Sequence, residues 1–143
     1  VISGMSEVNE WRLRNKISLG IALSKIGAVG TIALSNAWSQ TKQLSLFRKL
    51  FNDAKQGNPR NVEQYYRYSL KYNCTSRLGE IHLPVLLVYG EEDKHFHPYA
   101  NILHQHLPKS ELVFIKKADH RLPTKAAGSL NELIKQFIER FSL

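Results

Sequence analysis

The stretch Pro84–Asp93, PVLLVYGEED, decides the fold. Within it, Val85–Tyr89 is an unbroken apolar run between a proline and Gly90, which is typical of a strand covered on both faces in a parallel sheet. An acid, Asp93, follows the glycine after three positions. We therefore expect a buried strand that has a carboxylate just beyond its carboxyl end.

A second strand and two helices are expected downstream. Leu112–Ile115 is a short apolar run, and His120 follows it, 27 positions after Asp93. A helix is predicted from Pro98 to about His106, and another over 126–141, where an apolar stripe has helical spacing. Strands that alternate with helices predict a parallel sheet with right-handed crossovers.

Residues 5–78 show helical patterns only. Glu7–Lys25 has polar and apolar residues at helical spacing, and Leu44–Ala54 has one apolar face that ends before Gly57. Asn58 and Pro59 then start a further helix, because asparagine caps a helix and proline fits its first position. The composition therefore changes near residue 78, from helices alone to strands alternating with helices.

Composition bounds the class of protein and its partners. The chain has 143 residues, of which 43% are apolar and 22% charged, as in an ordinary soluble domain. Lysine and arginine number 20 against 12 acidic residues, a net charge of +8. These cations are scattered along the chain, so we expect no nucleic-acid partner. The single cysteine, Cys74, allows no internal disulfide, which favours a reducing, cytoplasmic setting.

The apolar stretch Ile17–Leu34 has the length of a short membrane span. However, Lys25 lies near its middle, and serines and glycines dilute it. A span needs ~20 predominantly apolar residues with few or no charges. We therefore expect no membrane partner and interpret this stretch as a buried or cleft-lining helix.

Asp93 and His120 point to nucleophilic catalysis. Ligands of open parallel sheets gather outside the carboxyl ends of the strands, where both residues are expected. A carboxylate that accepts a hydrogen bond from one ring nitrogen orients the histidine, whose other nitrogen can then take a proton from a nucleophile. Glu91 and Glu92 could substitute for the acid, although we expect both to be solvated.

Longer stretches around this pair resemble the α/β-hydrolase family. Ile81–Pro98, IHLPVLLVYGEEDKHFHP, resembles the acid-bearing strand, and Leu107–His120, LPKSELVFIKKADH, resembles the following strand and histidine loop. Residues 1–4 are similar to the strand that precedes the helical cap. The resemblance implies an α/β fold, the C-terminal part of an α/β hydrolase. Residues 5–78 would be the helical cap (lid) region, and 79–143 the C-terminal part of the core, with two or three parallel strands and flanking helices.

By this resemblance, Asp93 is the triad acid and His120 the general base. The family order of serine, acid and histidine places the nucleophile upstream, so we expect a C-terminal fragment whose missing N-terminal half carries it. Ser6, in Gly-Met-Ser-Glu-Val, lacks the second glycine and the preceding strand of a nucleophile elbow. One departure from the family pattern is Asp119, which stands where a glycine commonly precedes the histidine.

The expected function is a serine-type hydrolase that acts on an ester-like or related small-molecule substrate, needs no cofactor or metal, and is inactive as this fragment alone. The alternative is a non-catalytic binding or assembly module. Two or three strands would leave a sheet edge with unpaired backbone groups, through which a homodimer could form.

Two other groups have simpler interpretations. The His-x-His pairs lie on a polar helix surface, where two-residue spacing points ligands apart and disfavours zinc; they are His95, His97, His104 and His106. Tyr65, Tyr68 and Tyr72 follow a helical stripe, which in a cap favours packing over an active-site mouth more than stacking of nucleic-acid bases.

Overall fold

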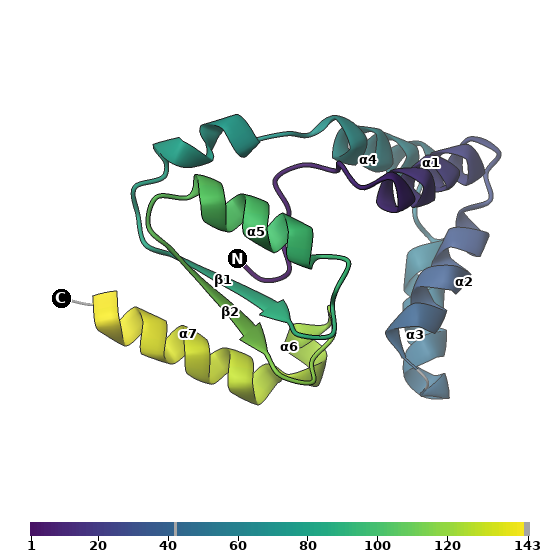
Figure 1. Ribbon diagram of the computed structural model, residues 1–143. Coiled ribbons are helices and arrows are strands. Elements are labelled where there is room, and N and C mark those ends of the chain that lie inside the picture. Colours follow the sequence, from purple (N-terminus) through teal and green to yellow (C-terminus); the bar gives the residue numbers. More distant parts are fainter. Residues whose placement is uncertain (42, 142–143) are drawn as a thin grey trace. The chain divides into compact units, whose positions relative to one another are not determined.

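The structure, a computed structural model, describes residues 1–41 and 43–141. The chain divides into two compact units (Figure 1). The core unit comprises Val1–Glu7 and Asn73–Leu143, and the helical unit comprises Val8–Tyr72. The interpretation of residues 5–78 as a cap stays a prediction.

The centre of the core unit is a parallel pair of strands, β1 (Val85–Gly90) and β2 (Ser110–Ile115). In their register, Val85 lies opposite Ser110 and Gly90 opposite Ile115. Residues 86–90 are all buried, as the unbroken apolar run predicted. The register places the carboxyl ends of both strands at the same edge of the sheet.

Helices cover both faces of this pair of strands (Figure 1). On one face lies α5 (His97–His106), and on the other lie α6 (Leu122–Lys125) and α7 (Ala127–Phe141). A 3-10 helix, η1 (Thr75–Glu80), packs beside α5. The α5 side has a buried cluster of Leu78, Leu87, Tyr89, Ala100, Leu103 and Leu107. The α7 side has a second cluster of Leu86, Val88, Ile115, Ala118, Leu122 and Leu130.

The first residues extend the sheet beside β1. Val88 donates its backbone N–H to the carbonyl oxygen of Val1 at 2.9 Å, and Ser3 N–H donates to Val88 O at 2.9 Å. Ile2 and Val88 thus form a parallel bridge. The hydroxyl of Tyr89 also donates to the carbonyl oxygen of Gly4 at 2.6 Å. The pairing is an isolated bridge followed by a left-handed backbone at Ser3, φ 44°, and the interpretation of residues 1–4 as the end of a core strand stays a prediction.

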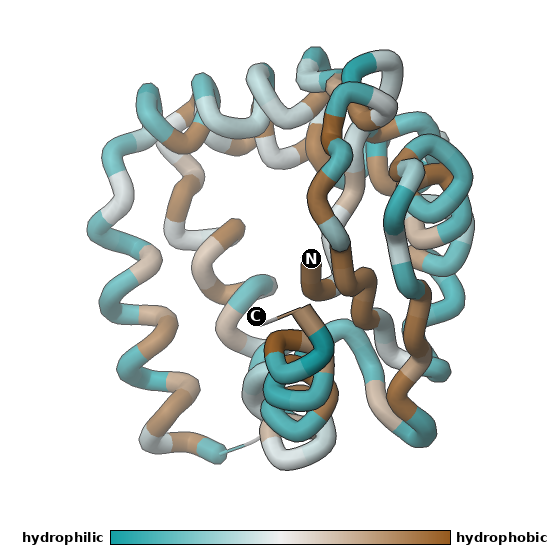
Figure 2. Tube along the Cα trace, turned by 90° about the vertical axis from the view of Figure 1, so that its left-hand side faces the viewer, coloured by the Kyte–Doolittle hydropathy of each residue, from teal (hydrophilic) through white to brown (hydrophobic). Residues whose placement is uncertain are grey.

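Four helices make up the described part of the helical unit: α1 (Trp11–Lys25), α2 (Val29–Gln40), α3 (Leu44–Lys55) and α4 (Pro59–Lys71). Helix α1 packs on α4, and α2 packs on α3. Hydrophobic residues are interspersed with hydrophilic ones along the chain (Figure 2), and they gather on one face in α3 and α4 but not in α1 and α2. No helix among residues 1–41 and 43–141 has the length and apolarity that crossing a membrane requires.

The helix ends follow local capping chemistry. Asn58 Oδ1 accepts from the N–H of Arg60 at 2.9 Å, and Pro59 opens α4, as predicted. The segment Glu7–Lys25, which has residues at helical spacing, is helical from Trp11 onward. Glu10 caps α1 by accepting from the Leu13 N–H at 3.3 Å, so the helix begins at Trp11. The short helix α6 was not predicted.

Candidate active site

A glycine lets the two strand ends approach closely. A Cβ atom on Gly90, the last residue of β1, would lie 2.3 Å from the carbonyl oxygen of Ala118 and 2.5 Å from that of Asp119. Both obstacles are backbone atoms, so a side chain here would force the loops apart. Because the loops lie this close, Glu92 donates its backbone N–H to Ala118 O at 2.9 Å, and Glu91 donates its N–H to Ile115 O at 3.0 Å. The loops after β1 and β2 are therefore joined by their backbones.

These joined loops bring together the two residues that the sequence singled out. His120 Nδ1 lies 2.8 Å from Asp93 Oδ2. A carboxylate has no proton to donate, so Nδ1 donates and the neutral ring keeps Nε2 as an acceptor. The Asp93 side chain is 8% exposed, whereas that of His120 is 50% exposed. The acid is thus enclosed, while the histidine can meet a reactant from solvent.

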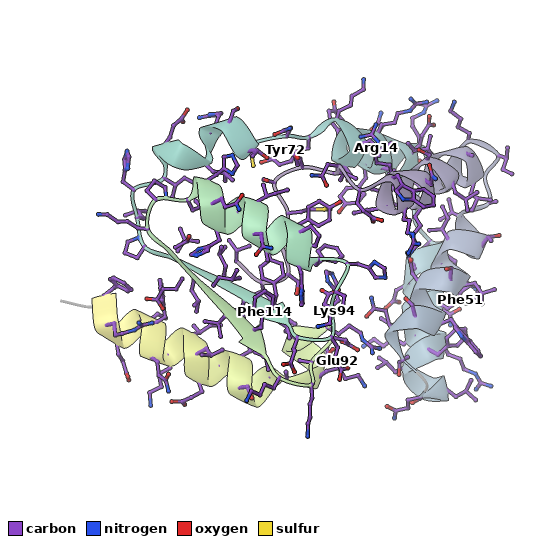
Figure 3. The ribbon with its side chains drawn as sticks, viewed as in Figure 1. Arg14, Phe51, Tyr72, Glu92, Lys94 and Phe114 are labelled. Carbon is purple, nitrogen blue, oxygen red and sulfur yellow. The ribbon has the colours of Figure 1, made fainter. Side chains whose placement is uncertain are left out.

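The turn after β1 holds the backbone of Asp93 in position. The N–H of Asp93 donates to Gly90 O at 3.1 Å, and the N–H of Phe96 donates to Asp93 O at 2.9 Å. His97 Nε2 also lies 3.1 Å from Gly90 O, and its ring lies 4.5 Å from that of Phe114, which Figure 3 labels. The backbone on both sides of the carboxylate is therefore fixed before substrate arrives.

Phe96 is a site residue that the sequence interpretation missed. Its ring centroid lies 4.2 Å from that of His120, with the planes tilted by 43°. The aromatic ring touches the imidazole, while Asp93 holds Nδ1. The available signal was an aromatic residue three positions after the acid, at the amino end of α5.

The histidine loop has its own supports. Lys117 has a left-handed backbone, φ 55°, which costs free energy in a residue other than glycine, and its N–H donates to Glu91 Oε2 at 3.1 Å. The Glu91 carboxylate therefore accepts a hydrogen bond from the histidine loop, whereas Asp93 is the carboxylate that contacts His120.

Asp119, the departure from the family pattern, has no positive φ. Its carboxylate accepts from the guanidinium and the backbone N–H of Arg121.

Two groups near the pair have shifted pKa values. Burial, with the nearby Asp93 charge as a second cause, raises the pKa of Tyr89 from 10.0 to about 12, although the hydrogen bond to Gly4 opposes the rise. The hydrogen bond from Arg121 lowers the pKa of Asp119 from 3.8 to about 2. Asp119 is thus ionised near neutral pH and paired with Arg121.

Other residues considered from the sequence lie elsewhere in the core unit. Ser6 is 2% exposed, and its hydroxyl lies 2.8 Å from Thr75 Oγ1, so it is enclosed and hydrogen-bonded. Cys74 is half-buried and packs against the α5-side cluster. His104 contacts Ser110 at 2.9 Å. No group of three His, Cys, Asp or Glu side chains converges as a metal site would require, within the described ranges.

The arrangement can move a proton. A ring nitrogen oriented by an enclosed carboxylate at the carboxyl edge of a parallel sheet is what the acid–base part of a nucleophilic hydrolase site would need. The roles of Asp93 and His120 remain a prediction. The structure places the two side chains within hydrogen-bonding distance.

Comparison with known proteins identifies the fold. No model of a known protein family matches the chain. The chain is 28% identical over 69 residues to a proline iminopeptidase of Thermoplasma volcanium, a match that spans 48% of this chain and 23% of the relative.

Solved structures match over greater lengths. MenH from S. aureus has a TM-score of 0.76 at 17% identity, over 97% of this chain and 57% of that structure. MGS-M2, an α/β hydrolase from a deep-sea metagenome library, has a TM-score of 0.74 at 18% identity, over 100% of this chain and 56% of that structure. The chain therefore spans little more than half the length of these structures. It has the fold of the C-terminal part of an α/β hydrolase.

Proposed function

We propose that this chain supplies the acid and the histidine of a serine-type α/β hydrolase, and that the nucleophile and oxyanion hole lie outside these 143 residues. The substrate is a small ester-like molecule. The observation that carries the proposal is the 2.8 Å contact between His120 Nδ1 and the enclosed Asp93 carboxylate. The two side chains lie at the carboxyl edge of a parallel sheet, where the active sites of such hydrolases form.

The proposed reaction uses His120 twice. Its Nε2 removes the proton of the serine hydroxyl while the serine oxygen bonds to the substrate carbonyl carbon. When the tetrahedral intermediate collapses, the bond to the leaving alcohol breaks, and the imidazolium returns the proton to that oxygen. Water then repeats both steps on the acyl-enzyme and releases the acid. Throughout, Asp93 holds Nδ1 and stabilises the imidazolium by its negative charge.

The test is Asp93→Asn in the complete protein. The amide keeps the size of the carboxylate but removes its charge and favours the wrong histidine tautomer, so turnover of a 4-nitrophenyl ester should fall by about 10⁴-fold. Asp53→Asn, an exposed carboxylate on α3, is the control and should retain wild-type turnover. Near-wild-type turnover in a folded Asp93→Asn protein would refute the assignment.

A second function, assembly through the sheet, is favoured by one observation. An apolar hollow of about 320 Å³ lies beside the strands. It is lined by Val1, Ile2, Pro84, Val85, Leu86, Val88, Ile134 and Phe137. A second copy could cover this surface and pair with an open strand edge. Light scattering on this chain decides the matter: a dimer supports assembly, and a stable monomer over the micromolar range contradicts it.

A further inference from the structure

The net charge of the chain resides entirely in one unit. Residues 8–72 contain 11 lysines and arginines but only three acids, Glu10, Asp53 and Glu63, which gives the helical unit a net charge of +8. The core unit has nine basic and nine acidic side chains and is neutral. Cations that look scattered along the sequence are thus concentrated in one compact unit, whose field attracts anions.

Two of the three acids are already engaged by groups of the helical unit itself. Glu10 caps α1, and Glu63 accepts from Arg67. Helix α4 contributes several of the cations and presents exposed aromatic rings beside them. Tyr65, Tyr68 and Tyr72 are 70%, 75% and 60% exposed, so they do not fill the interior of the unit. The interpretation of these rings as a stripe over an active-site mouth stays a prediction.

A hollow of about 310 Å³ lies along α4, lined by Gln64, Arg67, Tyr68 and Lys71. Its lining combines two cations, an amide that can donate, and an aromatic ring. Arg67 and Lys71 are four positions apart, so they lie on one side of the helix, one turn from each other. A small carboxylate could meet both cations while its hydrocarbon part lies on Tyr68. Figure 3 shows Tyr72 at the end of this helix.

The guanidinium of Arg67 is held in place before a ligand arrives. Its Nε and Nη2 atoms both lie 2.8 Å from Glu63 Oε1, and the Glu63 side chain is only 23% exposed. This contact fixes the guanidinium plane and leaves Nη1 to donate elsewhere. A pre-oriented guanidinium loses less conformational entropy when it binds a carboxylate than a free side chain would.

We propose that the hollow along α4 binds a small organic carboxylate. This inference stands on residues of the helical unit alone and does not depend on the proposed function.

The first measurement requires no catalysis. Benzoate is titrated into the ¹⁵N-labelled protein, and benzamide, its neutral analogue, is titrated in parallel. We expect benzoate to shift the amide resonances of residues 64–71, benzamide to leave them unchanged, and 0.5 M NaCl to reduce the benzoate response by screening. Equal responses to the two compounds, or benzoate shifts confined to other residues, would overturn the site.

The second measurement repeats the benzoate titration on single variants. Arg67→Gln and Lys71→Gln should each weaken benzoate binding by about fivefold, as expected for one partly exposed ion pair. Lys25→Gln, at the end of α1, removes the same charge from the same unit away from the hollow, and should retain wild-type binding.

The variants separate a specific site from general attraction by charge. If only Arg67→Gln and Lys71→Gln weaken benzoate binding, the inference is supported. If Lys25→Gln weakens it as much as Lys71→Gln, general attraction by the net charge of the unit replaces the specific site, and the inference is refuted.

Discussion

The Gly90→Ala substitution probes how the strand ends hold the acid–histidine pair. The added methyl carbon would lie 2.3 Å and 2.5 Å from two backbone carbonyl oxygens of the histidine loop. Even favourable carbon–oxygen contacts are ~3.3 Å long, so the loops must separate by about 1 Å. Overpacking of this kind costs ~1–3 kcal/mol. Loss of the 2.9 Å hydrogen bond from Glu92 to Ala118 adds ~1 kcal/mol. The expected loss of stability is therefore about 2–4 kcal/mol.

Urea unfolding followed by far-UV circular dichroism measures this loss as a lower midpoint at an unchanged slope. Gly128→Ala is the matched control, because nothing lies within 4 Å of its added carbon and alanine favours the helix α7. That variant should be as stable as the wild type or slightly more stable. If Gly90→Ala unfolds at the wild-type urea concentration, the loops are not held in the close approach described above.

The same substitution should affect chemistry. A shift of about 1 Å between the loops would lengthen the 2.8 Å contact between Asp93 and His120. Misplacement on that scale costs on the order of 100-fold in rate when a catalytic group is involved. The turnover of a 4-nitrophenyl ester by the complete protein, measured where both variants are folded, reads this effect separately from stability.

Three further predictions concern single side chains near the pair. The pKa of Tyr89 is raised to about 12, so the stability it contributes is complete below about pH 10 and falls as the pH rises toward 12. Tyr89→Phe should remove this fall, which urea midpoints measured across that pH range detect. Parallel pH curves for the wild type and the variant would contradict the reasoning. Arg121 lowers the pKa of Asp119 to about 2, so the stability from this pair is present above about pH 4 and is lost as the pH falls toward 2. Asp119→Asn should therefore lose less stability than the wild type between pH 4 and pH 2. Identical acid-unfolding profiles for the two proteins would refute this prediction. Phe96→Leu removes the aromatic ring 4.2 Å from His120, so it should move the ring-proton resonances of His120 downfield and should lower kcat more than it raises KM. The control Phe137→Leu, on α7, should have neither effect. Unmoved His120 resonances in Phe96→Leu would show that the two rings do not touch in solution.

The sequence was sufficient to predict the sheet and the pairing of the acid with the histidine. The run Val85–Tyr89 is apolar at every position, which indicates a strand buried on both faces, and the structure confirms it. Asp93 and His120 follow neighbouring parallel strands after short loops, so strand order and loop length bring them to the same place. Both of these quantities can be inferred from the spacing of apolar runs.

The supports of the pair could not be predicted in the same way. The need for glycine at position 90 depends on the register of β1 with β2, which brings Ala118 within contact distance. The resemblance drew attention to Asp119 as the residue that replaces a flexible glycine. The structure instead gives the left-handed backbone to Lys117, whose N–H contacts Glu91. Sequence spacing does not contain such contacts, because they follow from how two loops pack.

The unequal distribution of charge between the two units could not be predicted from the sequence for a similar reason. Cations of the helical unit are separated along the chain by apolar positions, and each segment taken alone looks like an ordinary solvated helix. Only the division into compact units shows that 11 basic and three acidic side chains belong together. A count over the whole chain gives the same +8 but hides the neutrality of the core unit.

The contacts described above for Asp93 and His120 lie within the core unit: the β1–β2 register, the backbone bonds between the loops, the Phe96 ring, and the Glu91–Lys117 bond. The backbone bonds between the loops require the close approach that glycine permits at position 90. It follows that Gly90→Ala should disturb the His120 ring resonances together with the amide resonances of the loop around residues 117–121. A change confined to His120 would show that the loop backbone does not carry the effect.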